Sequence, residues 1–250
     1  MMMRFLYLCV GLMILVSCDK AADHDAQTPL VIITSPDNPP FEFKDTAKGG
    51  DEVIGFDMDV AHKLSEHLGR PVKIMEADFS AIIPSLQSGR ADMAISTIAA
   101  TDERRKSVDF SDPYYQQELA LLVLEDALLE TEKHLAGKAL GVQTGTTHET
   151  LGYKWVKETP PLTIISLSKM GELVQELKNH RVHAVLTEGE TARRIASATP
   201  GIKAVPLEVK GEELAIVFPK GSPWVAPVNE KLKIMNKDIQ NIATKWLKTK

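Results

Sequence analysis

Short apolar runs alternate along this chain with segments whose apolar residues recur at helical spacing. An apolar, β-branched run that stops at turn residues predicts a strand, and apolar residues three and four apart predict a buried helix face. Strands are predicted at residues 30–34, 72–75, 91–96, 119–124, 138–142, 162–167, 183–187 and 214–218, and helices at 146–156, 170–179 and within 229–250. Strands that alternate with helices of this length imply βαβ units and a mainly parallel sheet, so the predicted fold class is α/β.

Two further helices are predicted from their end signals. Asp57 is a candidate N-cap for a helix that ends at Gly69, with Pro71 just beyond it. Ser80 is a candidate N-cap for the next helix, which ends at Gly89. These residue types match the usual preference for a short polar side chain at the start of a helix and a glycine after its end.

One helix-turn-strand unit is repeated in the second half of the chain. Residues 86–97 match residues 177–188 in the positions of Leu, Arg, Ile or Leu, and Ser or Thr. The repeat predicts two lobes built on the same plan, although any helix-turn-strand unit can produce such a pattern. It places Ser96 and Thr97 at the same strand end as Thr187 and Glu188, and open α/β sheets bind ligands at the carboxyl ends of their strands.

The N-terminus has the pattern of a secretory signal. A single charge at Arg4 precedes an apolar segment, residues 5–16, that is too short to span a bilayer. The following Leu-Val-Ser-Cys sequence resembles a bacterial lipobox, which implies lipidation at Cys18, although a chance cysteine in an ordinary signal peptide is the alternative. The predicted organisation is therefore a lipoprotein signal peptide at 1–18 and a flexible tether at 19–29. Asp19 resembles the residue that retains lipoproteins on the inner membrane of some Gram-negative bacteria.

Composition narrows the classes of function. The chain is 44% hydrophobic and 25% charged with a formal net charge of −5, which indicates a globular protein and argues against nucleic acid as a partner. No segment after the signal reaches the length of a transmembrane helix, so the folded part is expected to be soluble and tethered. The histidines show no metal-ligand spacing, and we expect neither a metal nor a cofactor. Only Cys18 would remain in the mature chain, which excludes an internal disulfide.

A cation stands where helix electrostatics disfavours it. Thr101 is a candidate N-cap, and Asp102 and Glu103 suit the positive end of the helix dipole, but Arg104 does not. A bound anion near Arg104 would explain its position. The alternative is a solvated basic patch, formed with the two residues that follow, whose charges pair with neighbouring acids.

The sequence Thr-Asp-Glu-Arg at 101–104, followed by Val-Asp-Phe-Ser-Asp-Pro-Tyr-Tyr at 108–115, resembles the signature of family 3 bacterial extracellular solute-binding proteins. Gly-Phe-Asp-Met-Asp at 55–59 is similar to a second motif of that family. The resemblance implies a two-lobed periplasmic binding protein fold of type II with two crossover hinge strands. It places residues 30–118 and 219–250 in lobe 1, and residues 119–218, with the hinge strands, in lobe 2.

The same resemblance implies a site for an amino acid between the lobes. Arg104 would grip the ligand carboxylate, and Glu188, where the family most often has Asp, would bind the ammonium group. Phe79 would stack on the ligand side chain, although core packing is its alternative role. The predicted ligand-binding residues are Ser35, Asn38, Phe79, Ser96, Thr97, Ala99, Arg104, Gln143, Thr147 and Glu188. Ala99 departs from the usual Ser or Thr, and Asn38 replaces a common aromatic residue.

The predicted function is that of the substrate-binding component of an ABC importer, a monomer that delivers a polar amino acid to its permease. Asp37, Asp78 and Gln143 favour arginine or another basic amino acid. The predicted location is the cell envelope, with a lipid anchor and the domain facing the periplasm, or the exterior in a Gram-positive organism. The alternatives are a prephenate-type dehydratase on the same fold and an amino-acid sensor module.

Overall fold

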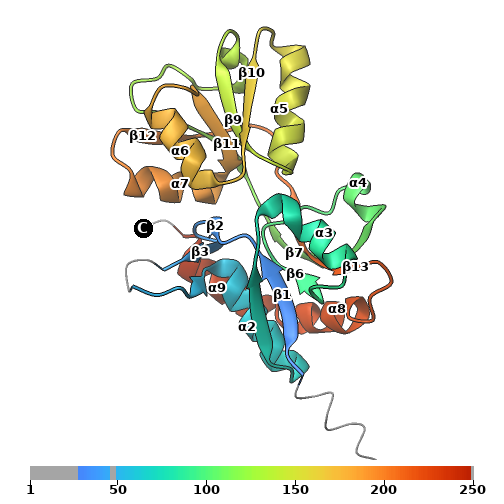
Figure 1. Ribbon diagram of the computed structural model, residues 1–250. Coiled ribbons are helices and arrows are strands. Elements are labelled where there is room, and N and C mark those ends of the chain that lie inside the picture. Colours follow the sequence, from blue (N-terminus) through green and yellow to red (C-terminus); the bar gives the residue numbers. More distant parts are fainter. Residues whose placement is uncertain (1–27, 46–48, 249–250) are drawn as a thin grey trace, which may run out of the picture.

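The computed structural model describes residues 28–45 and 49–248. Figure 1 shows two lobes joined by thin connections, each built around its own sheet. The predicted two-lobed α/β architecture is confirmed. The predicted signal peptide, Cys18 and the tether up to residue 27 lie outside the described residues. Within the described residues, no helix has the length and apolar character needed to cross a membrane.

The first lobe contains a five-stranded sheet in the order β5-β1-β6-β13-β7. Its strands are β1 (Leu30–Thr34), β5 (Val72–Glu76), β6 (Met93–Ala94), β7 (Val108–Gln116) and β13 (Glu213–Pro219). A small sheet is formed by β2 (Asp37–Asn38), β3 (Glu42–Lys44) and β4 (Val53–Ile54). The helices are α2 (Phe56–Leu68), η2 (Phe79–Ala81), α3 (Ile82–Gln87), α4 (Asp102–Arg105), α8 (Val225–Ile234) and α9 (Asn236–Trp246). Strand β1 runs parallel to β5 and β6, as the βαβ pattern predicts, but β13 runs antiparallel to β6 and β7, so the sheet is mixed rather than mainly parallel.

The second lobe repeats this plan with the order β10-β9-β11-β8-β12. Its strands are β8 (Leu119–Leu124), β9 (Ala139–Gln143), β10 (Thr163–Leu167), β11 (Ala184–Glu188) and β12 (Ile202–Pro206). Its helices are η3 (Glu132–Leu135), α5 (Thr147–Glu158), α6 (Met170–Lys178) and α7 (Gly189–Ala198). The repeat seen in the sequence corresponds to α3-β6 in the first lobe and α6-β11 in the second.

The chain crosses between the lobes at residues 117–118 and again at 207–212, between strands of different sheets. The two crossings touch, because the amide of Gln117 donates to the carbonyl of Glu212 at 3.0 Å. A Cβ at Gly211 would lie 1.7 Å from the Gln117 carbonyl oxygen, so this close approach requires glycine. The lobe boundaries implied by the resemblance place residues 213–218 in lobe 2, but β13 pairs with β7 and β6 in the first sheet.

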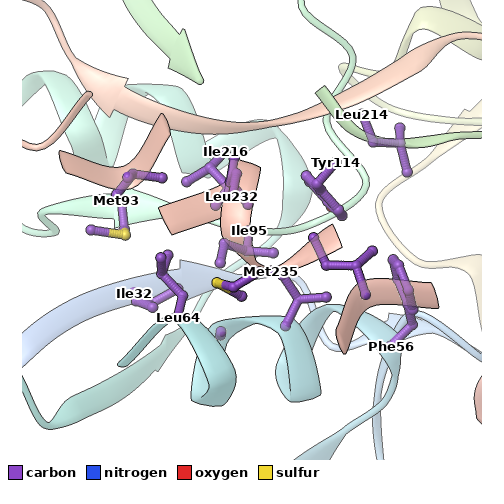
Figure 2. Close-up of a cluster of buried hydrophobic side chains, with 14 of the residues drawn as sticks. Ile32, Phe56, Leu64, Met93, Ile95, Tyr114, Leu214, Ile216, Leu232 and Met235 are labelled. Atoms are coloured by element: carbon purple, nitrogen blue, oxygen red, sulfur yellow. The ribbon is translucent and has the colours of Figure 1, made fainter. Parts of the chain in front are cut away.

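Figure 2 shows the apolar cluster under one face of the first sheet. Ile32, Met93 and Ile216 from the strands meet Phe56 and Leu64 of α2 there. A second cluster covers the opposite face, and two clusters enclose the second sheet in the same way. Burial on both faces explains why the central strands read as continuous apolar runs.

Two predicted caps differ from the structure. Helix α2 starts at Phe56, with Gly55 as N-cap at φ 133°, and a Cβ there would lie 2.1 Å from the Phe41 carbonyl oxygen. Asp57 is therefore inside the first turn and fully buried, where it accepts hydrogen bonds from distant residues. Ser80 lies within η2, and the N-cap of α3 is Ala81, which has no capping side chain. Gly69 ends α2 in the left-handed conformation, as predicted.

Candidate functional site

A closed cavity lies between the two lobes. Its volume is about 10 Å³, room for roughly one water molecule. It is lined by Ser35, Asp37, Asn38, Glu42, Phe79, Thr97 and Arg104 from the first lobe, Gln117 from a crossing, and Gln143, Thr146, Thr147, His148 and Glu188 from the second. Every predicted ligand-binding residue except Ser96 and Ala99 thus lines this one cavity.

Direct contacts between the lobes explain why the cavity is small. Asp37 Oδ2 accepts hydrogen bonds from the Gln143 side-chain amide at 3.1 Å and from the Met170 backbone at 3.0 Å. Further contacts join Asn38 to Thr191, Tyr115 to Glu190, Asp78 to Lys169 and Arg104 to Gly145. Burial raises the pKa of Asp37, and the hydrogen bond from Met170 and the charge of Lys169 act in the opposite direction. Opening the cleft would break all of these contacts.

Arg104 is held at the cavity by the short helix α4. The hydroxyl of Thr101 accepts a hydrogen bond from the Arg104 amide at 3.2 Å, which confirms Thr101 as the N-cap. The guanidinium donates to the carbonyls of Ala99 at 3.0 Å and Gly145 at 3.1 Å, and it lies 5.5 Å from the centre of the Phe79 ring. Burial lowers the pKa of Arg104, and the charge of Glu212 acts in the opposite direction. The solvated-patch interpretation is therefore wrong for Arg104, whose guanidinium faces the cleft.

The first lobe holds a buried pair of carboxyl groups, of which Glu42 lines the cavity and Asp57 lies behind it. Glu42 and Asp57 are 1% and 0% exposed. Glu42 Oε1 accepts from the hydroxyls of Ser96 at 3.0 Å and Thr97 at 3.2 Å, and Asp57 accepts from the Thr97 amide at 2.8 Å and the Tyr114 hydroxyl at 2.9 Å. These bonds hold Thr97 at a φ of 46°, which is unusual for a β-branched residue. Such backbone strain is common where a structure positions groups for function.

Burial in this region disfavours ionised carboxylates. It raises the pKa of Asp57 to about 7, although hydrogen bonds from Thr97 and Tyr114 act in the opposite direction. Burial and the neighbouring charge of Asp57 raise the pKa of Glu42 well above its ordinary value. We infer that the pair retains a proton near neutral pH, because two adjacent buried carboxylates cannot both ionise cheaply.

Side chains from the second lobe complete the cavity. Helix α5 starts at Thr147 with Thr146 as its N-cap, one residue after the start predicted from the sequence. The Thr147 hydroxyl donates to Glu212 Oε2 at 2.6 Å. Glu188, which ends β11, is 6% exposed, and its Oε1 lies 4.0 Å from Nε2 of His148. The Thr187 hydroxyl donates to the other oxygen of Glu188 at 2.8 Å.

Ser96 and Ala99 lie behind the cavity rather than at its wall. Besides its bond to Glu42, the Ser96 hydroxyl accepts from the Ser35 amide at 3.0 Å. Ala99 forms a bridge with Leu214, and its carbonyl is used by Arg104. Asn38 donates from its amide to the Thr97 hydroxyl at 3.0 Å. Ser96 and Ala99 therefore do not line the cavity themselves, but each supports a group that does.

Several lining residues were not predicted as ligand contacts. His148 lines the cavity and is 4% exposed, and its Nε2 has no hydrogen-bond partner among the described residues. Glu42 stands between two phenylalanines, a pattern that gives no sign of a buried acid. Gln117 and Thr146 also carry no recognisable signal. Asp37, by contrast, was noted as a possible partner for a cationic ligand, and it lines the cavity. In the described part of the chain, no group of three or more His, Cys, Asp or Glu is placed to hold a metal ion.

Two lobes that close on a polar cavity, joined by two chain crossings, define a bilobal solute-binding protein. The sequence profile of bacterial extracellular solute-binding proteins, family 3, matches residues 30–249. The chain belongs to this family, which confirms the resemblance.

Individual relatives cover most of the chain. The arginine-binding extracellular protein ArtP of Bacillus subtilis is 31% identical over 235 residues, which are 91% of this chain and 89% of that protein. A probable histidine-binding protein of Campylobacter jejuni is 32% identical over 249 residues, 96% of this chain and 92% of that protein. A solved structure described as an ancestral arginine-binding protein bound to arginine has a TM-score of 0.83 and 35% identity, and the match covers 89% of this chain and 100% of that one.

Proposed function

We propose that the protein is the substrate-binding component of an ABC importer and that its ligand is a basic amino acid, with arginine as the first candidate. The observation that carries this proposal is the charge of the cavity wall. The carboxyl groups of Asp37 and Glu188 line it, together with Glu42, whose pKa is raised well above its ordinary value by burial, and Arg104 is the only Arg or Lys among the described residues that line it. A basic amino acid has two positive groups and one negative group, which matches this wall. The arginine and histidine named for two relatives support the same class of ligand.

Each charged group of the ligand has a proposed partner. Arg104 suits the carboxylate, because a guanidinium can bind it with two parallel hydrogen bonds. Glu188 suits the α-ammonium. The hydrogen bond that the Thr187 hydroxyl donates to the Glu188 carboxyl group is of the kind that supports an anion. Asp37 suits the cationic end of the side chain, with Gln143 beside it. The remaining proposed contacts are Ser35, Asn38, Phe79, Thr97 and Thr147, supported from behind by Ser96 and Ala99.

The ligand must enter an open form, because the closed cavity holds about one water molecule. We propose that the lobes open by bending at residues 117–118 and 207–212, the two places where the chain crosses between sheets. Bending a few residues at a boundary between rigid units is a common way to close on a ligand. The lobes would then close on the bound amino acid, less tightly than in this structure, and present it to the permease.

We also propose that the mature protein is a monomer anchored by lipid at Cys18 and facing the periplasm, or the exterior in a Gram-positive organism. The lipobox-like sequence at 15–18 supports the anchor. Mass spectrometry of the purified mature protein should show an N-terminal residue carrying acyl chains. An unmodified N-terminus, or cleavage at another residue, would contradict the anchor and leave the binding function untouched.

A thermal-shift screen of the ligand-stripped protein tests the binding function. We expect arginine, at a hundred times its dissociation constant, to raise the unfolding midpoint by several degrees, because a ligand that binds only the folded state stabilises it. The screen should include the twenty amino acids, ornithine, citrulline and prephenate. If no amino acid raised the unfolding midpoint, the proposal would be contradicted. A rise with prephenate alone would favour the dehydratase alternative.

The same screen on Asp37→Asn tests the preference for a basic side chain. We expect the dissociation constant for arginine to rise about tenfold, because one charge-assisted contact is worth on the order of 1.4 kcal/mol. Citrulline, whose side chain is neutral, should be affected less. Asp126→Asn is a matched control, because Asp126 is exposed and does not line the cavity. Equal losses for arginine and citrulline would show that Asp37 does not recognise the charge.

A further inference from the structure

Glu212 connects the hinge to the cavity. It lies on the second chain crossing, just before β13, and its carbonyl accepts a hydrogen bond from the Gln117 amide of the first crossing. Its side chain reaches the start of α5, where Oε2 accepts from the Thr147 hydroxyl at 2.6 Å. The side-chain amide of Gln117 lies 3.4 Å from the same oxygen. One carboxylate thus contacts both a hinge residue and a residue of the cavity wall.

The bond from Thr147 affects what the cavity can bind. A threonine hydroxyl has one hydrogen to donate. While that hydrogen is donated to Glu212, the hydroxyl can offer only lone pairs to a ligand. Lone pairs repel a carboxylate, so Thr147 cannot contribute its proposed contact in this state.

Arg104 also lies in the field of Glu212, whose charge acts to raise the pKa of this guanidinium. In the closed structure the guanidinium donates to two backbone carbonyls, Ala99 and Gly145. Arg104 and Thr147, which we propose hold the ligand carboxylate together, therefore both already interact with a carboxylate of the protein itself. A second carboxylate arriving beside Glu212 would meet like-charge repulsion.

A second cavity offers the Glu212 side chain another position. A neighbouring cavity of about 330 Å³ lies on the hinge side of Arg104 and is lined by Glu212 together with Arg105 and Lys210. These two cations offer an alternative environment for the displaced carboxylate. After losing its hydrogen bond from Thr147, the Glu212 carboxylate would therefore still lie near positive charges.

We propose that Glu212 is an internal competitor for the ligand carboxylate: it holds Thr147 in the closed structure, and a ligand carboxylate displaces it toward the hinge-side cavity. This inference rests on the proposed function, because it assumes a ligand with an α-carboxylate. Its consequence is that Glu212 weakens binding of amino acids, and that ligand entry alters a contact made by the hinge itself.

The experiment measures arginine binding by calorimetry on the ligand-stripped full domain. We expect Glu212→Gln to lower the dissociation constant at least fivefold, because a neutral amide accepts a weaker hydrogen bond from Thr147 and does not repel the ligand carboxylate. Glu213→Gln is the matched control: Glu213 is the adjacent residue, it is exposed, and it lines only the hinge-side cavity. Its dissociation constant should stay within twofold of the original. Thermal unfolding confirms that both variants are folded.

A second ligand separates competition from a general charge effect. Argininamide keeps the side chain and the ammonium of arginine but lacks the negative carboxylate. In Glu212→Gln the ratio of the argininamide to the arginine dissociation constant should therefore rise at least fivefold. An unchanged ratio, or weaker arginine binding by the folded variant, would overturn the inference and leave the proposed function standing. If the original protein bound no amino acid, the proposed function would fail first, and the inference with it.

Discussion

Replacing Arg104 by alanine should raise the dissociation constant for arginine at least a hundredfold. In the part of the chain that the structure describes, Arg104 is the only Arg or Lys that lines the closed cavity, and burial leaves little water to take its place. Removing one partner of a buried, hydrogen-bonded charge pair typically costs about 2–5 kcal/mol, since the other charge is left desolvated. Calorimetric titration of the ligand-stripped protein measures this loss directly.

Two further variants make the result specific. Arg104→Lys keeps the positive charge but not the planar pair of donors, so we expect an intermediate loss of about tenfold. Lys106→Ala removes a cation from the same segment, but Lys106 is exposed and pairs with Glu103, so binding should stay within twofold. Binding that remains tight in a folded Arg104→Ala variant would contradict the carboxylate role. Equal losses in Arg104→Ala and Lys106→Ala would indicate a general effect of charge instead.

The elements that could be predicted from the sequence are those whose periodicity is local. Strand β1, helix α2 and strand β11 bury one face or both faces on a sheet, and their apolar residues show it. Strand β7 gives no such signal, because it contains Asp109, Asp112 and Pro113. It lies at the edge of its sheet with irregular pairing to β13, where a proline is tolerated.

Site residues that belong to a sequence motif, such as Arg104, could be predicted. Site residues whose partners are far away in the sequence could not. Asp57 looks like a helix cap because an acid at a helix start usually is one. Its actual partners, Thr97 and Tyr114, are 40 and 57 residues away. Glu42 would be exposed on an isolated strand, and only the fold places it beside Ser96. Because these partners are far apart in the sequence, no local pattern can indicate that they are in contact.

The second large effect concerns pH. The free energy of unfolding of the ligand-free protein should fall by about 2–3 kcal/mol between about pH 5 and pH 8 through Asp57. Burial raises the pKa of this group from 3.8 to about 7 in the folded state. In this range the folded protein therefore binds more protons than the unfolded chain, and stability decreases as pH rises. Urea unfolding at several pH values measures the change.

Asp57→Asn tests the origin of this dependence, because asparagine has nearly the same shape and no charge to titrate. Its unfolding free energy should lose most of the decline with pH. Asp59→Asn, on the same helix, is the matched control: Asp59 is partly exposed and pairs with Lys245, so the decline should remain. A decline that persists in Asp57→Asn would place the proton elsewhere, with Glu42 as the next group to replace.

Because Asp57 and Glu42 together hold Thr97 at a strained φ, their proton is linked to the shape of the cavity wall. Ionising both carboxyl groups would place two negative charges in a space with no Arg or Lys bonded to either, among the described residues. An ionised carboxylate accepts a stronger hydrogen bond than a neutral one, so the contacts that hold Thr97 should change over the same pH range in which stability declines. Measuring arginine affinity across the same pH range, in the original protein and in Asp57→Asn, would show whether this second effect reaches the ligand.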